Sequence, residues 1–140
     1  MPHASASRLL LASREDVWAL IAEPHRFADW WPGVVAVEPG RSGMAEGARW
    51  DLRGHDRPSL FRRTTSSGKL FVRGVRRPER FAWTLMSDHL DAELRLEEKG
   101  PDRTVATLVV EAPWLYGFGS ALPRRALTRL HALCQTPAGL

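Results

Sequence analysis

The stretch L-L-L-A-S-R-E-D-V-W-A-L-I-A-E-P-H-R-F-A-D-W-W-P-G-V, residues 9–34, carries the strongest fold signal in this sequence. Ser13 is a favoured helix N-cap residue and Asp16 follows three positions later, so the two form a capping box that predicts a helix start. The apolar residues behind this box recur at helical spacing and give the helix one buried face. They are Val17, Leu20 and Ile21.

A second short helix is predicted directly after the first. Pro24 ends the first helix, because proline lacks the backbone N–H that a helix interior needs, and it can open a new helix that carries Phe27. W-W-P-G then turns the chain. Trp30 and Trp31 either pack in the core or stand at the mouth of a pocket, and adjacent residues in a turn can do one of each.

Strand-like alternation with a period of two begins at Val34 and continues through most of the chain. Short connections, among them a predicted turn at Ser66-Ser67-Gly68, separate the strands, so neighbouring strands are expected to pair antiparallel. The predicted strands cover 5–11, 34–37, 48–53, 60–65, 69–76, 81–86, 90–98 and 104–112, and 60–65 is the weakest of them.

The chain is expected to end in an amphipathic helix. Ser120 can cap this helix, Pro123 falls in its first turn, where a missing N–H costs little, and Pro137 ends it. The whole order predicts an α+β domain in which a curved antiparallel sheet of six to seven strands wraps around a C-terminal helix. One helix cannot fill the whole hollow of such a sheet, so a small-molecule cavity is expected.

Length and composition narrow the class of protein. A chain of 140 residues is expected to form a single domain, 1–140, and one cysteine, Cys134, rules out an internal disulfide. The start of the chain shows no secretory signal pattern, and no stretch is long and apolar enough for membrane insertion, so a cytoplasmic protein is expected. The five histidines show no metal-ligand spacing, and neither a metal nor another cofactor is predicted.

Charge is concentrated in the middle of the chain. The segment from Arg49 to Arg80 holds ten basic and three acidic residues, whereas the whole chain has a net charge of +4. Such a field can attract an anionic ligand or an acidic carrier protein. No helix-turn-helix, zinc-finger or aromatic RNA-binding motif accompanies it, so nucleic acid is not predicted as a partner.

Residues 9–34 resemble the opening of the START-like, helix-grip superfamily (SRPBCC), in its polyketide cyclase/dehydrase and lipid-transport branch. R-R-P-E-R-F-A-W-T, residues 76–84, is similar to a middle hairpin of that family, and the last helix also fits. The resemblance implies the helix-grip fold with two short helices after the first strand. It does not imply one activity, because this superfamily contains carriers, receptors, hydrolases and cyclases.

The candidate ligand-binding residues come from the expected inner faces of the sheet and helices. Aromatic rings there can stack on a flat or polycyclic ligand. For most of them, lining a pocket and forming the core are alternatives that the sequence leaves open. The candidates are Trp30, Trp31, Trp50, Phe71, Trp83, Leu85, Leu94, Leu122 and Leu127.

The sequence does not identify catalytic residues, and Arg73 and Tyr116 are the candidates it offers. If Phe71 points into the hollow then so does Arg73, and a partly buried guanidinium needs a partner such as Glu111 or a ligand carboxylate or enolate. The alternative is an exposed arginine on the outer face. The hydroxyl of Tyr116, the only tyrosine, can bond a ligand or the local backbone.

Three functions are compatible with these residues. The first is binding of a small hydrophobic molecule, aromatic or polyketide/lipid-like, between the sheet and the C-terminal helix. The second is a polyketide cyclase/aromatase-like enzyme that directs aldol cyclisation and dehydration by positioning and oriented hydrogen bonds. The third is an interaction domain without a ligand, which predicts a filled interior and a large exposed apolar patch.

Overall fold

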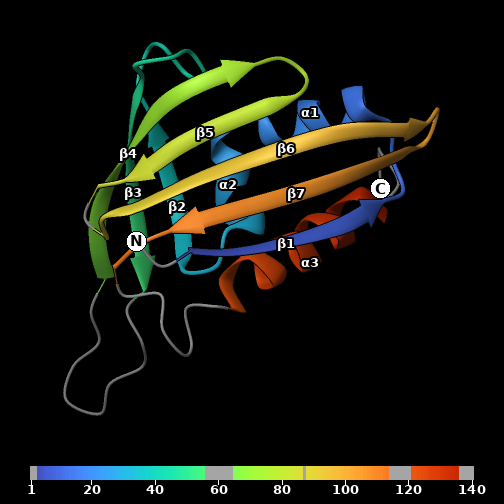
Figure 1. Ribbon diagram of the computed structural model, residues 1–140. Helices are drawn as coiled ribbons and strands as arrows, with labels where there is room; N and C mark the ends of the chain where they lie inside the picture. Colours follow the sequence, from blue (N-terminus) through green and yellow to red (C-terminus); the bar gives the residue numbers. More distant parts are fainter. Residues whose placement is uncertain (1–2, 56–64, 87, 114–120, 136–140) are drawn as a thin grey trace.

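The computed structural model describes residues 3–55, 65–86, 88–113 and 121–135 (Figure 1). The elements, in chain order, are β1 (His3–Leu10), α1 (Arg14–Ile21), the 3₁₀ helix η1 (Pro24–Arg26), α2 (Phe27–Trp30), β2 (Val34–Pro39), β3 (Arg49–His55), β4 (Thr65–Arg76), β5 (Arg80–Leu85), β6 (Leu90–Gly100), β7 (Arg103–Glu111) and α3 (Leu122–Gln135).

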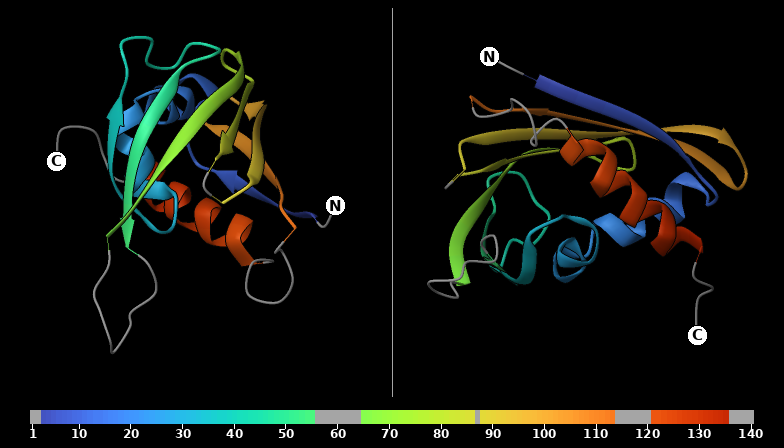
Figure 2. Two further views of the ribbon diagram at one scale, coloured as in Figure 1. Left: turned by 90° about the vertical axis from the view of Figure 1, so that its left-hand side faces the viewer. Right: turned by 90° about the horizontal axis from the view of Figure 1, so that it is seen from below.

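The strands of the described residues form one antiparallel seven-stranded sheet in the order β1-β7-β6-β5-β4-β3-β2. The sheet curves, and the helices lie on its concave side (Figure 2). β1 and β2 are at opposite edges, so α1, η1 and α2 cross the concave side between them. The predicted α+β helix-grip architecture is therefore confirmed, including the two short helices after the first strand and the C-terminal helix.

Local sequence rules explain where the first helices begin and end. The Ser13 hydroxyl accepts a hydrogen bond from the Asp16 N–H at 3.1 Å and caps α1 as predicted. Pro24 is the first residue of η1, where its missing N–H has no cost. After α2, Gly33 has a φ of 89°, a left-handed conformation that glycine adopts without strain.

Alternation along the strands separates the two faces of the sheet. In β6, the even-numbered residues from Leu90 to Leu96 are buried on the concave side, and the odd-numbered residues between them lie on the outer face. α3 packs chiefly against β1, β7 and α2, and its arginines face solvent. Full burial of a large apolar side chain contributes about 1.5–3 kcal/mol, which fixes the orientation of α3 through Pro123, Ala126, Leu127 and Leu130.

Two features of β4 differ from simple alternation. The predicted turn at 66–68 is wrong, because these residues continue β4 and pair with residues 52–54 of β3. Pairing with a neighbouring strand outweighs the weak strand preference of Ser and Gly. The second feature is a β-bulge between Val72 and Gly74.

The predicted strand 60–65 lies outside the described residues except for Thr65, and the predicted cap Ser120 lies outside them too. None of the described helices is long and apolar enough to cross a membrane.

Candidate functional site

Six aromatic side chains meet at the centre of the concave face, and we call them the aromatic cluster. Phe81 and Trp83 of β5 stack with ring centroids 4.5 Å apart, and Phe27 of α2 meets Trp83 edge-on at 5.7 Å. Ring pairs of this kind contribute about 0.5–1.5 kcal/mol beyond the area they bury. The members are Phe27, Trp30, Trp31, Trp50, Phe81 and Trp83.

Both rings of the adjacent Trp30-Trp31 pair belong to the cluster. Trp30 ends α2 and Trp31 is its extended C-cap, so the two rings leave the backbone in different directions and lie at 85° to each other. Both nevertheless reach Trp83, with centroid distances of 5.9 Å from Trp30 and 5.3 Å from Trp31. The pair therefore covers β5 from the side of the short helix.

The cluster is closed in this structure. Trp30, Trp50 and Trp83 have no solvent-exposed surface, and Trp31 is 2% exposed. Solvent therefore does not reach these rings, which are enclosed by the surrounding protein.

Two hydrogen-bond donors inside the cluster have no acceptor among the described residues. The indole Nε1 atoms of Trp30 and Trp83 are buried and unpaired, whereas the Trp50 Nε1–H donates to the Gly43 carbonyl oxygen at 2.6 Å. Buried donors in native proteins almost always have a partner, and one left without costs about 1–3 kcal/mol. The part of the chain that the structure describes therefore supplies no acceptor to these two indoles at the centre of the concave face.

The remaining candidate ligand-binding residues lie in three places. Leu85, Leu94 and Leu127 are buried on the concave side. Leu122, at the start of α3, is half-buried and packs against the core. Phe71 pairs with Thr84 and Arg49 in the sheet, and its half-buried ring on the outer face lies 5.9 Å from the Arg49 guanidinium.

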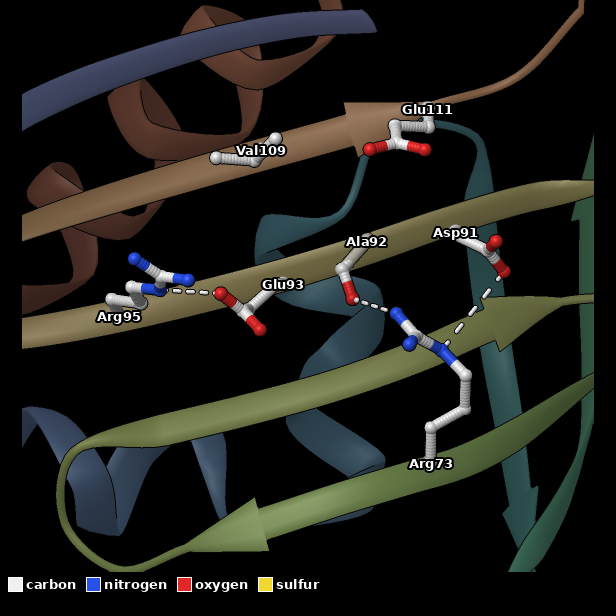
Figure 3. Close-up of a pocket in the computed structure, with 7 residues that line it drawn as sticks. All are labelled: Arg73, Asp91, Ala92, Glu93, Arg95, Val109 and Glu111. Atoms are coloured by element: carbon white, nitrogen blue, oxygen red, sulfur yellow. Dashed lines mark hydrogen bonds and ion pairs between the residues drawn. The ribbon is translucent and has the colours of Figure 1, made fainter. Parts of the chain in front are cut away.

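Arg73 lies on the outer face, next to the β-bulge. Its Nη2 donates to the backbone carbonyl oxygens of Ala92 at 3.1 Å and Trp83 at 3.4 Å, and its Nε lies 3.9 Å from the Asp91 carboxylate. Figure 3 shows the guanidinium reaching from β4 over β5 toward β6. Arg73 therefore links three strands from outside the cluster, and Glu111, also on the outer face, has no partner among the described residues.

An open hollow of about 320 Å³ on the outer face surrounds this arginine (Figure 3). Most of its charged groups already have partners. Glu93 accepts from Arg80 at 2.6 Å and also from Arg95, and the Thr84 hydroxyl donates to Asp91 at 2.6 Å. The lining residues are Arg73, Asp91, Ala92, Glu93, Arg95, Val109 and Glu111.

The ion pairs of Glu93 control its protonation. Partial burial alone raises the pKa of this carboxyl group, but hydrogen bonds and positive charge from Arg80 and Arg95 outweigh burial, so the pKa lies below its usual value. The outer hollow thus contains a carboxylate held in its charged form by two arginines.

Two further predictions concern Tyr116 and a metal site. Tyr116 lies outside the described residues. No group of three or more His, Cys, Asp or Glu side chains in the described part of the chain is arranged to hold a metal ion.

Comparison with a family model agrees with this architecture. The model for "Polyketide cyclase / dehydrase and lipid transport" matches residues 1–133. The chain belongs to this family. The polyketide cyclase/dehydrase and lipid-transport model matches nearly the whole chain. All the described helices and strands lie within the matched residues, apart from the last two residues of α3. No curated protein sequence matches the chain significantly.

Solved structures share the fold at low sequence identity. A protein from Nitrosomonas europaea has a TM-score of 0.74 at 15% identity and covers 95% of this chain and 94% of its own. One from Chromobacterium violaceum has a TM-score of 0.74 at 14% identity, with coverages of 98% and 100%. One from Nitrosospira multiformis has a TM-score of 0.71 at 19% identity, with coverages of 96% and 97%. At these identities the likeness shows the fold alone.

Sequence reasoning missed the two unpaired indole donors. Trp30 and Trp83 are 53 positions apart and meet only after β5 folds beneath α2, so no local pattern marks them. The number of tryptophans, six in 140 residues, was the one available signal, because each buried indole must find an acceptor.

Proposed function

We propose that this chain binds a small hydrophobic molecule, aromatic or polyketide/lipid-like in character, between the concave face of the sheet and its helices. One observation carries the proposal: the centre of that face is covered by side chains of α2, not by α3. α2 has only four residues and no side-chain N-cap, so tertiary contacts alone hold it in place.

Those contacts are ones that a ligand can replace. Phe27 and Trp31 stack with centroids 5.5 Å apart at 11°, and both meet Trp83 edge-on. An aromatic ligand that enters between α2 and β5 exchanges ring contacts within the protein for ring contacts of the same kind. Because the cluster is closed, binding requires α2 to move away from β5.

Binding is favoured over the cyclase alternative by the chemistry of the inner face. Thr104 is the one buried polar residue in the described part of the chain, and its hydroxyl donates to the Ala12 carbonyl oxygen at 2.9 Å. Arg73, the catalytic candidate, directs its guanidinium to the outer face. A cyclase needs polar groups aimed at its substrate, and the described residues place no charged side chain in the buried core to assist them.

Docking of an acidic carrier protein to the basic segment 49–80 has less support. Five of its basic residues already pair with carboxylates of this chain, at N–O distances of 2.6–3.9 Å. These residues are Lys69, Arg73, Arg76, Arg77 and Arg80. Carrier docking and a cytoplasmic location therefore stay predictions from the sequence.

Native mass spectrometry of gently purified protein tests the proposal, with the denatured protein as the reference. We expect an additional mass in the native sample that is released on denaturation. A second assay adds N-phenyl-1-naphthylamine, an uncharged fluorescent probe of apolar sites. Saturable binding that Trp31→Leu weakens and the outer-face control Phe71→Leu does not is the expected result. Absence of both a bound mass and saturable probe binding contradicts the proposal.

A further inference from the structure

The unpaired donors of Trp30 and Trp83 define the chemistry of the ligand, if the proposed binding function holds. We infer that the ligand carries an uncharged acceptor oxygen, as in an aromatic ketone or quinone, which receives the indole N–H of Trp30, Trp83 or both. The inference rests on the proposed function and adds to it the polar group that the ligand must present.

The position of the two donors supports a shared acceptor. Trp30 belongs to the covering helix α2 and Trp83 to the sheet strand β5, and their rings meet at 89° with centroids 5.9 Å apart. These are the two surfaces between which the ligand is proposed to enter. The two elements thus each contribute one ring with an unpaired N–H to the place where the ligand is proposed to enter.

Trp50 is the comparison within the same cluster, because its indole N–H has an acceptor in the protein itself. Its ring lies 6.0 Å from Phe27, and its N–H is satisfied by the chain's own Gly43 carbonyl. Within the described ranges, the chain therefore supplies an acceptor to Trp50 and none to Trp30 or Trp83. Contact of an N–H with the face of a neighbouring ring is a weak substitute for an oxygen acceptor.

The surroundings select an uncharged oxygen. An indole N–H donates only, so a ligand amine or ammonium group cannot pair with it as a donor. A carboxylate needs a cation when it is buried, and no charged side chain of the described residues is buried. A carbonyl on an apolar ring system meets both conditions.

The test compares two ligands that differ in one group. 1-Acetylnaphthalene has a carbonyl where 1-ethylnaphthalene has a methylene, and the two are similar in shape. The hydrocarbon is the more hydrophobic of the two, so burial alone favours it. One net hydrogen bond of about 1.4 kcal/mol corresponds to a factor of ten, so we expect the ketone to bind more tightly despite its lower hydrophobicity, by up to about tenfold.

Proton–nitrogen correlation spectra of ¹⁵N-labelled protein follow the individual indoles, assigned by single Trp→Phe variants. With the ketone, the Trp30 or Trp83 N–H signal is expected to move downfield while the Trp50 signal stays in place. With the hydrocarbon, none of the three shows this change. In a Trp30→Phe/Trp83→Phe variant the preference for the ketone disappears, whereas Phe71→Leu on the outer face retains it. An unchanged Trp50 signal shows that the double variant is folded.

The outcomes separate the two proposals. Equal affinity for both ligands, or tighter binding of the hydrocarbon with unmoved Trp30 and Trp83 signals, overturns the inference and leaves the binding function intact. Binding of neither ligand overturns the inference for aromatic ketones, and the native mass spectrum and the probe assay then decide on the proposed function. The wild-type spectra decide between these outcomes even if the double variant does not fold.

Discussion

The Arg73 guanidinium donates to the Ala92 carbonyl oxygen at 3.1 Å across the outer face of the sheet. Arg73 also reaches the Trp83 carbonyl, so it holds the backbone of a cluster residue from the opposite side. Its position beside a β-bulge explains the need for it, because a bulge interrupts the ladder of backbone hydrogen bonds.

Arg73 therefore has a structural role, and Arg73→Ala is expected to lower the stability of the fold. Removing hydrogen bonds from a charged, partly exposed donor is expected to lower the free energy of unfolding by about 1–2 kcal/mol, measured by urea denaturation. Arg53→Ala is the control, because Arg53 is exposed on β3 and has no ion pair among the described residues. Loss of ligand binding at unchanged stability is the result that speaks against this role.

The two faces of the sheet are expected to respond differently to loss of an aromatic ring. Trp31→Ala removes a ring that is 2% exposed and is expected to cost about 3–5 kcal/mol of unfolding free energy. Phe71→Ala on the outer face is expected to cost about 1 kcal/mol, because that ring is half-buried. Thermal or urea unfolding compares them, and equal costs contradict a core centred on the concave face.

Glu93 is expected to make stability depend on pH in the acid range. Its pKa in the folded protein lies below the usual 4.5, so the unfolded chain binds the proton more readily. The stabilisation is therefore fully present above about pH 4.5 and is lost as the pH falls through the lower folded-state pKa. Unfolding of Glu93→Gln measured against wild type is expected to show a deficit at neutral pH that shrinks on acidification.

The matched control for Glu93 is Glu97→Gln on the same strand. Glu97 is paired with Lys99 but its side chain is 70% exposed, against 17% for Glu93. Exposed ion pairs contribute little to stability, so the unfolding free energy of Glu97→Gln is expected to equal that of wild type at every pH. A pH-independent difference between Glu93→Gln and wild type contradicts the assignment.

Cys134 is expected to be unreactive in the folded protein. Burial, with a smaller contribution from the negative charge of Asp16, raises the pKa of its thiol to about 11. Only the thiolate reacts, and two pKa steps above the ordinary value leave roughly 100-fold less of it at neutral pH. Reaction with a disulfide reagent is expected to be slow in the folded chain and fast in denaturant. Asp16→Asn is expected to speed it modestly, and equal rates for the folded and denatured protein contradict the prediction.

The elements with a local signal were predictable. The Ser13 cap, the break at Pro24 and the alternation of β6 each depend on neighbours in sequence, and the structure reproduces them. The extra length of β4 was not predictable, because residues 66–68 become a strand only through pairing with β3. The local sequence of residues 66–68 favours a turn, but hydrogen bonding to β3 stabilises the extended strand instead.

The site was predictable in composition but not in orientation. Side chains alternate between the two faces along a strand, so the sequence correctly places Phe71 and Arg73 on the same face. It does not tell which face of the sheet that is. The structure places both on the outer face, because Leu70 and Val72 fill the concave side. The aromatic residues of the cluster were recognisable as apolar, whereas the lack of acceptors for two of them appears only in three dimensions.

The strand order has a consequence for how the chain folds. β1 pairs with β7, with His3 opposite Glu111, so the first strand has no partner until nearly the whole chain has been synthesised. Contacts between such distant residues close large loops and slow folding. We therefore expect the curved sheet to grow from the hairpins between β3 and β7, with the N-terminal strand joining the edge last.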